Sequence, residues 1–151
     1  MLNKLHTMRE ERAQGENGFT LIELLVVVVI IGILIAIAIP LYLNYKKGAN
    51  DKAAQSDVRN AISVLETCNS DNSTYPASLG TATGNAYTPC TGQTINFTAN
   101  TTLTYAAAGT SPTFTSYTLH GTNSGGIPKF YCYNSANGGS VSTVATATTA
   151  C

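Results

Sequence analysis

The feature that most constrains this chain is an apolar run that begins directly after an acidic residue. Between Leu24 and Ile39 the sequence contains no polar side chain, and Glu23 stands immediately before this run. A helix of about 20 apolar residues spans a bilayer, and an acidic side chain at the centre of such a helix costs roughly 2.5–3.5 kcal/mol, less near an end. The next cations in the sequence are Lys46 and Lys47. Glu23 is therefore a candidate functional residue, whose partner is expected from another chain or from a new amino terminus.

Residues 18–25 read Gly-Phe-Thr-Leu-Ile-Glu-Leu-Leu, and this motif resembles the class III signal sequence of type IV pilins and their relatives. The resemblance runs from Gly18 to Pro40 and combines a cut site, an aromatic residue, a placed carboxylate and an apolar run. It implies that a prepilin peptidase cuts between Gly18 and Phe19 and methylates the amino group of Phe19. It also implies that Glu23 pairs with the amino group of a neighbouring subunit, which supplies the missing cation.

The resemblance divides the chain into three segments. Residues 1–18 are a cleaved leader peptide, residues 19–49 are the hydrophobic helix of the membrane and the filament core, and residues 50–151 are a globular head. A cleaved secretory signal is the alternative for the apolar run, because residues 36–38, Ala-Ile-Ala, resemble an A-x-A cut site. That alternative leaves Glu23 unexplained, and it predicts a mature chain that starts at Ile39 rather than at Phe19.

Two residues interrupt the apolar helix, Gly32 and Pro40. Proline removes a backbone donor and clashes with the preceding turn, so a kink or local melting is expected at residues 37–40. The pilin resemblance implies that the segment between such a glycine and proline unwinds when subunits pack in a filament. Gly32 and Pro40 therefore join Phe19 and Glu23 as expected assembly residues.

The sequence after Asn50 predicts an amphipathic helix followed by strands. Apolar residues recur every three or four positions from Ala54 to Cys68, and polar residues occupy the other face. Residues 73–92 read as a loop, and strand candidates follow at 94–98, 103–107, 114–120, 129–133 and 141–145. The predicted fold class is α+β, the pilin fold: a long N-terminal helix, kinked near Pro40, packed on a C-terminal antiparallel β-sheet of four or five strands.

Four cysteines are widely spaced and form no C-x-x-C pair: Cys68, Cys90, Cys132 and Cys151. An even count in an exported chain favours disulfides over metal, and three pairings can form. The pairs Cys68–Cys90 and Cys132–Cys151 are favoured because sequential pairs close short loops. The resemblance supports the second pair, since pilins often close their C-terminal region with a disulfide. Each bond stabilises the head by roughly 2–4 kcal/mol.

The charged residues give no sign of catalysis or of nucleic-acid binding. The chain has eight basic and eight acidic residues, and the leader holds three of each, which leaves five of each in residues 19–151. After Asp71 only Lys129 is charged, so a nucleic-acid role has little electrostatic support. His120 is the one histidine after the leader, and no metal-ligand spacing appears, so no catalytic residue, cofactor or metal is predicted. Asp51 and Asp57 are interpreted as a solvated helix face rather than as calcium ligands.

The resulting prediction is a structural subunit of a type IV pilus, with a major pilin favoured over a minor one. The precursor is expected to cross the inner or cytoplasmic membrane once, with its N-terminus inside, because Lys4, Arg9 and Arg12 precede the span. It then assembles through its helix into an extracellular filament for adhesion, motility or DNA uptake. Expected partners are identical subunits, the inner membrane, the prepilin peptidase and the pilus assembly machinery. A type II secretion or competence pseudopilin is the alternative within the class, and a membrane-tethered monomeric binding domain is the alternative of another class.

Overall fold

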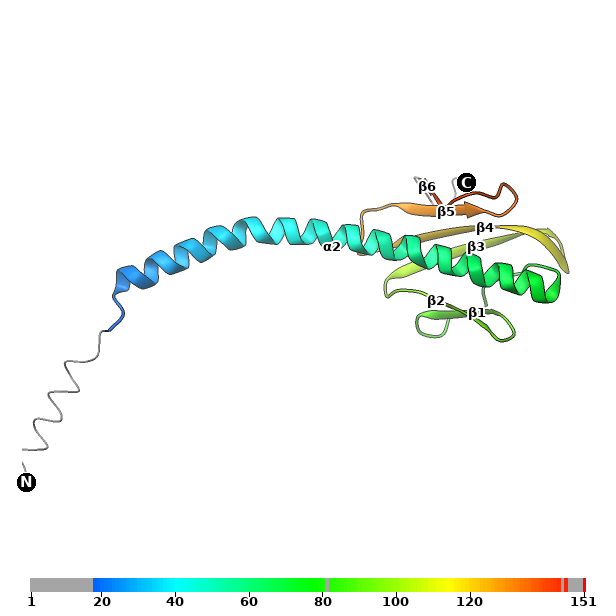
Figure 1. The fold of residues 1–151 in the computed structure, drawn as a ribbon, viewed down its shortest axis with the longest axis horizontal. Helices are drawn as coiled ribbons and strands as arrows, with labels where there is room; N and C mark the ends of the chain where they lie inside the picture. Colours follow the sequence, from blue (N-terminus) through cyan, green and yellow to red (C-terminus); the bar gives the residue numbers. More distant parts are fainter. Residues whose placement is uncertain (1–17, 81, 145, 147–150) are drawn as a thin grey trace, which may run out of the picture. The chain divides into compact units, whose positions relative to one another are not determined.

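The computed structural model describes residues 18–80, 82–144, 146 and 151 (Figure 1). Contacts divide the chain into two compact units at the junction of Tyr42 and Leu43. The expected leader, apart from Gly18, lies outside the described residues. The second unit contains all of the described β-strands and the described hydrophobic core.

One helix, α2, runs from Leu21 to Asn72. It ends within the polar cluster where the sequence predicted a stop, and the side-chain amide of Asn72 donates to the carbonyl of Cys68 at 2.9 Å. That bond satisfies one of the carbonyls that a helix end leaves without a partner. The helix is unbroken at residues 37–40, so Pro40 causes no local unwinding in this single chain. The unwinding implied for the filament stays a prediction.

The main sheet has four antiparallel strands in the order β3-β4-β5-β6. Their bounds are β3 Thr101–Thr110, β4 Thr113–Asn123, β5 Phe130–Asn134 and β6 Ser142–Val144. A two-residue turn joins β3 to β4, because Thr110 pairs with Thr113, and both strands therefore extend beyond the predicted ranges. These strands confirm the α+β class and the antiparallel sheet of four strands.

A separate hairpin corrects the sequence prediction. Strands β1 (Ala86–Cys90) and β2 (Gln93–Asn96) pair with each other and form a two-stranded sheet of their own. The sequence predicted β1 as loop and placed residues 94–98 in the main sheet. Pro89 and the neighbouring glycines hid the strand signal, but Gly92, with a φ of 80°, makes a tight turn between the two strands.

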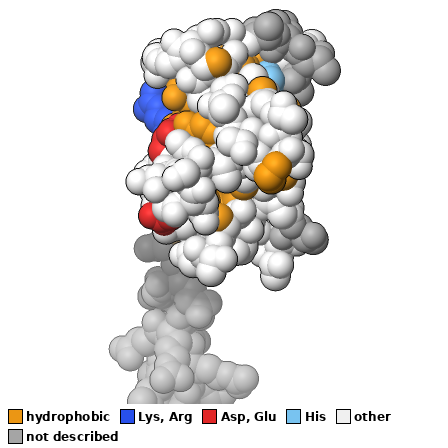
Figure 2. Space-filling view, turned by 90° about the vertical axis from the view of Figure 1, so that its right-hand side faces the viewer, with side chains coloured by type: hydrophobic (Ala, Val, Ile, Leu, Met, Phe, Trp, Pro, Cys, Tyr) orange, Lys and Arg blue, Asp and Glu red, His pale blue; other side chains and the backbone are white. Residues whose placement is uncertain are grey.

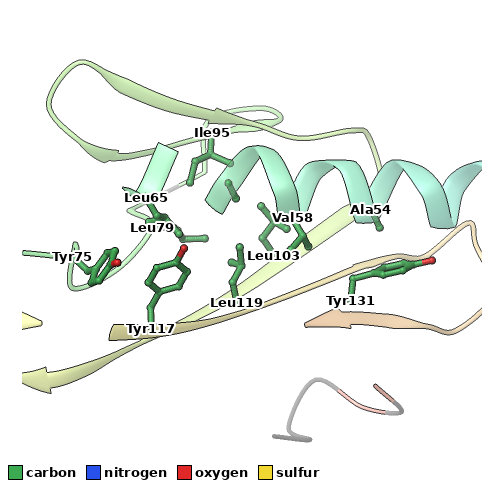
Figure 3. Close-up of a cluster of buried hydrophobic side chains, with 11 residues drawn as sticks. Ala54, Val58, Leu65, Tyr75, Leu79, Ile95, Leu103, Tyr117, Leu119 and Tyr131 are labelled. Carbon is green, nitrogen blue, oxygen red and sulfur yellow. The ribbon is translucent and has the colours of Figure 1, made fainter. Parts of the chain in front are cut away.

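The core of the head lies between α2 and the two sheets (Figure 3). Between Ala54 and Cys68, apolar residues at spacings of three and four contribute to it, as predicted. The fully buried side chains include Ala54, Val58 and Leu65 from α2, Ile95 from β2, and Tyr117 and Leu119 from β4. At Gly121 the main sheet comes so close to the helix that an added Cβ would overlap the Val58 side chain. Glycine at this position therefore permits the contact between β4 and α2.

The predicted solvated helix face at Asp51 and Asp57 is wrong. Their exposed fractions are only 4% and 8%. The Asp57 carboxylate accepts hydrogen bonds from the backbone N–H of Thr98 at 2.9 Å and from the Thr98 hydroxyl at 3.2 Å. Asp51 is covered by the loop at Gly126, where an added Cβ would overlap the carboxylate. Helical periodicity assigned these residues to the outer face, but the loops after β2 and β4 fold over it.

Most of the visible surface of the head is neither charged nor hydrophobic (Figure 2). The basic residues of the second unit, Lys46, Lys47, Lys52, Arg59 and Lys129, are all exposed. Among the acidic residues of this unit, Asp71 is exposed and Glu66 is half-buried. The exposed charged side chains of this unit are therefore five cations and one acid, whereas those that are buried or half-buried are all acids.

Candidate functional site

The start of α2 is a capping box formed by Thr20 and Glu23. The Thr20 backbone N–H and the Thr20 hydroxyl both donate to Glu23 Oε2 at 2.8 Å. In return, the backbone N–H of Glu23 donates to Thr20 Oγ1 at 3.3 Å. This reciprocal pattern satisfies donors that the first turn of a helix otherwise leaves unpaired. The capping box was not predicted, although the Thr-x-x-Glu spacing at residues 20–23 is its sequence signature.

Glu23 therefore has partners within its own chain. The sequence predicted a cationic partner from another chain or from a new amino terminus, but neutral donors from Thr20 already bind the carboxylate. The positive end of the helix dipole favours a carboxylate in the first turn as well. An intermolecular contact at Glu23 would thus add to local hydrogen bonds or replace them.

The two residues at the expected cut precede the helix. Gly18 and Phe19 are exposed and have no regular secondary structure. An added Cβ at Gly18 would meet nothing within 4 Å. Phe19 also lines a shallow groove with Ile22, Val26 and Val27, and this groove lies beside Glu23. The peptide bond between Gly18 and Phe19 is thus accessible, next to an acidic side chain with apolar surroundings.

The helix after Glu23 carries a large apolar surface. From Leu21 to Tyr45 its large hydrophobic side chains are between 48% and 81% exposed. By length and composition, this helix is the one in the described part of the chain that could cross a membrane. Such a surface is stable in lipid or against other apolar helices, but not in water.

Two disulfides fasten the head. Cys68 at the end of α2 bonds Cys90 of β1, with their Cα atoms 6.0 Å apart, and so ties the hairpin to the helix. Cys132 of β5 bonds Cys151, with a Cα separation of 5.6 Å. These are the two pairings that the cysteine spacing favoured.

His120 of β4 is buried beside the second disulfide. Its Nε2 atom lies 3.0 Å from Cys132 Sγ and 4.0 Å from Cys151 Sγ. One nitrogen and two sulfur atoms thus lie within 4.8 Å of one another. Zinc binds thiolates, and both sulfurs are here bonded to each other, so we assign no metal centre to these residues.

A carboxylate holds two tyrosines in the middle of the head. Glu66 of α2 accepts hydrogen bonds from the hydroxyls of Tyr75 at 2.9 Å and Tyr117 at 3.1 Å. The rings of Tyr75 and Tyr117 meet edge to face, with centroids 4.8 Å apart. Burial, with a further contribution from Glu66, raises the pKa of Tyr75 to about 12. The same causes raise the pKa of Tyr117. This network joins helix to sheet.

Comparisons with known proteins agree with the geometry at the start of α2. Residues 14–39 match the family described as the prokaryotic N-terminal methylation motif. The chain is 36% identical over 124 residues to the type IV major fimbrial protein FimA of Dichelobacter nodosus, a match that covers 80% of this chain and 74% of that protein. The chain therefore belongs to the type IV pilin family, as the motif at residues 18–25 indicated.

Two further relatives match over shorter stretches. The type IV wide pilus major component PilA4 of Thermus thermophilus is 42% identical over 62 residues, which is 41% of this chain and 47% of that protein. The type II secretion system core protein G of Klebsiella michiganensis is 40% identical over 65 residues, which is 43% of this chain and 46% of that protein. A pilus component and a secretion-system protein are thus each similar to part of this chain.

Proposed function

We propose that this chain is a structural subunit of a type IV pilus, assembled through α2 into an extracellular filament. The observation that carries the proposal is the exposed apolar surface of α2 from Leu21 to Tyr45. Burying one such side chain stabilises it by roughly 1.5–3 kcal/mol relative to water. A bilayer provides this burial before assembly, and a bundle of identical helices provides it afterwards. The relatives FimA and PilA4 bear the names of pilus components.

Before assembly, the precursor is proposed to cross the inner or cytoplasmic membrane once, with its N-terminus inside. A prepilin peptidase cuts between Gly18 and Phe19 and methylates Phe19. The exposed, non-helical backbone at these residues supports the cut, because a protease needs an accessible peptide bond. The pilus assembly machinery then moves the subunit into the filament, where the segment between Gly32 and Pro40 unwinds as helices pack.

Glu23 is proposed to set the register of each new subunit. Cleavage creates an amino group at Phe19, and the amino group of a neighbouring subunit would bind Glu23 beside the groove of Ile22 and Val26. A carboxylate in a dry helix bundle is stable only with a charged partner, so a misplaced subunit leaves it uncompensated. The hydrogen bonds from Thr20 hold the carboxylate in place before the neighbour arrives.

The capping box makes a sharp test possible. Glutamine can replace glutamate in a capping box, so Glu23→Gln removes the charge and keeps the cap, whereas Glu23→Ala removes both. Asp71→Asn is the matched control, since Asp71 is an exposed acid near the other end of the same helix. Filament yield is measured by shearing and electron microscopy, and the mature amino terminus by sequencing.

We expect both Glu23 variants to be cleaved normally and to form few or no filaments, whereas Asp71→Asn assembles as the parent does. Normal filament yield from Glu23→Gln, with loss only in Glu23→Ala, would show that the residue acts as a cap and not as an intermolecular charge.

The variant Gly18→Leu tests the cut. The fold leaves free space for a bulky side chain at residue 18, and this variant is expected to leave uncut precursor in the membrane. Filaments built from that precursor would refute the cleavage site.

The alternative within the class is a type II secretion or competence pseudopilin. The match to the secretion protein spans 43% of this chain, whereas the match to FimA spans 80% and so extends into the head. This difference favours the pilus. Long fibres on the cell surface would support it, short periplasmic fibres would support the secretion system, and no fibre at all would support a membrane-tethered monomer.

A further inference from the structure

The two disulfides of the head are alike in loop length and in the burial of their cysteines, but their neighbours differ. Each closes a comparable stretch of chain, with sequence separations of 22 and 19 residues. Each joins a buried cysteine to a half-exposed one: Cys68 is 0% exposed and Cys132 is 1% exposed, whereas Cys90 and Cys151 are accessible in part. His120 contacts the second bond, and no other histidine follows the leader.

We propose that His120 makes Cys132–Cys151 a thiol–disulfide exchange site, with His120 acting as the proton donor and acceptor for Cys132. Exchange proceeds by attack of a thiolate on one disulfide sulfur. Cys151 is the more exposed of the two cysteines, so its sulfur is the proposed point of attack for the incoming thiolate, and Cys132 is the leaving group. Its sulfur lies 3.0 Å from the imidazole nitrogen, within reach of a proton.

The electrons and atoms balance with a small dithiol as the reductant. Its thiolate attacks Cys151 Sγ, the Cys132–Cys151 bond breaks, and the electron pair leaves on Cys132 Sγ, which takes a proton from the imidazolium of His120. The second thiol of the reductant then attacks its own sulfur in the mixed disulfide and releases the Cys151 thiolate, which takes up a proton from solvent. The reductant becomes a cyclic disulfide, and the two protein sulfurs gain two electrons. Oxidation follows the reverse path, with the imidazole accepting the proton of Cys132.

The strands beside His120 carry few titratable groups. The strands packed beside β4 carry only tyrosines as titratable side chains, namely Tyr105 on β3 and Tyr131 and Tyr133 on β5, while β4 itself adds Tyr117. Burial raises the pKa of Tyr131, and it raises that of Tyr105 to about 12, so these stay neutral. Lys129 before β5 is exposed, and residues 145–150 have no titratable side chain.

The experiment compares both disulfides in the same molecule. Full-length protein in detergent micelles is treated with dithiothreitol between pH 5.5 and 8.5, with EDTA present, and free thiols are alkylated at intervals. Trypsin cuts after Arg59 and Lys129 and places the two disulfides in different peptides, residues 60–129 and 130–151. Mass spectrometry then gives the two reduction rates. The fraction of dithiothreitol present as thiolate changes with pH, but it affects both rates equally. The ratio of the two rates is therefore independent of it.

We expect the rate ratio, second disulfide over first, to fall as the pH rises across this range, as a proton donor beside Cys132 requires. A neighbouring opposite charge lowers a pKa by about 1–3, and exchange rates change by a factor of about three per pKa unit of the thiol, so the fall is about three- to thirtyfold. In His120→Asn the ratio is expected to be independent of pH. A ratio independent of pH in the parent protein would overturn the proposal without any variant, and so would a folded His120→Asn protein that keeps the pH dependence.

Discussion

The contact between Gly121 and Val58 gives a quantitative test of how α2 packs on the main sheet. A methyl group at residue 121 would overlap Val58 Cγ2, approach Leu103 Cδ2 to 3.1 Å and lie 3.5 Å from the carbonyl of Ala54. Overpacking of a well-packed core costs roughly 1–3 kcal/mol. Gly121→Ala is therefore expected to lower the free energy of unfolding by that amount.

The partner substitution opens the space that the methyl group needs. Val58 is fully buried, and Val58→Ala removes two methyl groups worth about 0.8 kcal/mol each, with a further cost for the cavity. The expected loss is about 1.5–3 kcal/mol. In the double variant the new methyl group at residue 121 occupies part of that cavity. The loss of unfolding free energy in the double variant is thus expected to be smaller than the sum of the two single losses by at least about 1 kcal/mol.

Urea unfolding of the full chain in detergent measures these free energies. The near-ultraviolet circular dichroism of its eight tyrosines reports the packed core, since the chain has no tryptophan. Gly48→Ala is the control, because residue 48 is helical and has free space around it; it should stabilise the protein by about 0.5–1 kcal/mol. Additivity within about 0.5 kcal/mol, or a Gly121→Ala variant as stable as the parent, would refute the packing argument.

Two further predictions concern the tyrosine network. Glu66→Gln replaces a charged acceptor with a neutral one and should lower the free energy of unfolding by about 1–2 kcal/mol; a variant as stable as the parent in urea would contradict this. Burial raises the pKa of Tyr75 and Tyr105 to about 12, above their unfolded value near 10. The folded state therefore holds these protons more tightly, so this contribution to stability is complete below pH 10 and is lost as the pH rises toward 12. Thermal unfolding at stepped pH, with tyrosinate absorbance followed in parallel, checks this; simultaneous titration of all eight tyrosines near pH 10 in the folded protein would exclude it.

The elements that were predicted well have strong local signals. The main strands are rich in β-branched and aromatic residues, and α2 ends where Asn69 to Asn72 compete for backbone hydrogen bonds. Strand β1 lacked such a signal because Pro89 and nearby glycines are typical of loops. Its position depends on the disulfide to Cys68 and on pairing with β2, and neither contact is local in sequence.

The charged and polar contacts were harder to predict for the same reason. Asp57 meets Thr98 across 41 residues, and a helical wheel contains no information about that loop. His120 meets Cys132 because β4 and β5 pair in one particular register, which the sequence pattern does not specify. The capping box at Thr20 and Glu23 was different, since its spacing was visible but was interpreted only through the apolar run that follows.

Because Asp51 and Asp57 are buried, equal numbers of acidic and basic residues do not make the surface of the head neutral. At physiological ionic strength charges act over about 8 Å, and the exposed cations of the second unit, Lys52, Arg59 and Lys129 among them, outnumber its one exposed acid, Asp71. Stacked in a filament, such heads would attract a layer of small anions, and this layer would reduce the repulsion between neighbouring heads. The spacing and stiffness of the fibre would then depend on salt, although the count of charged residues describes it as neutral.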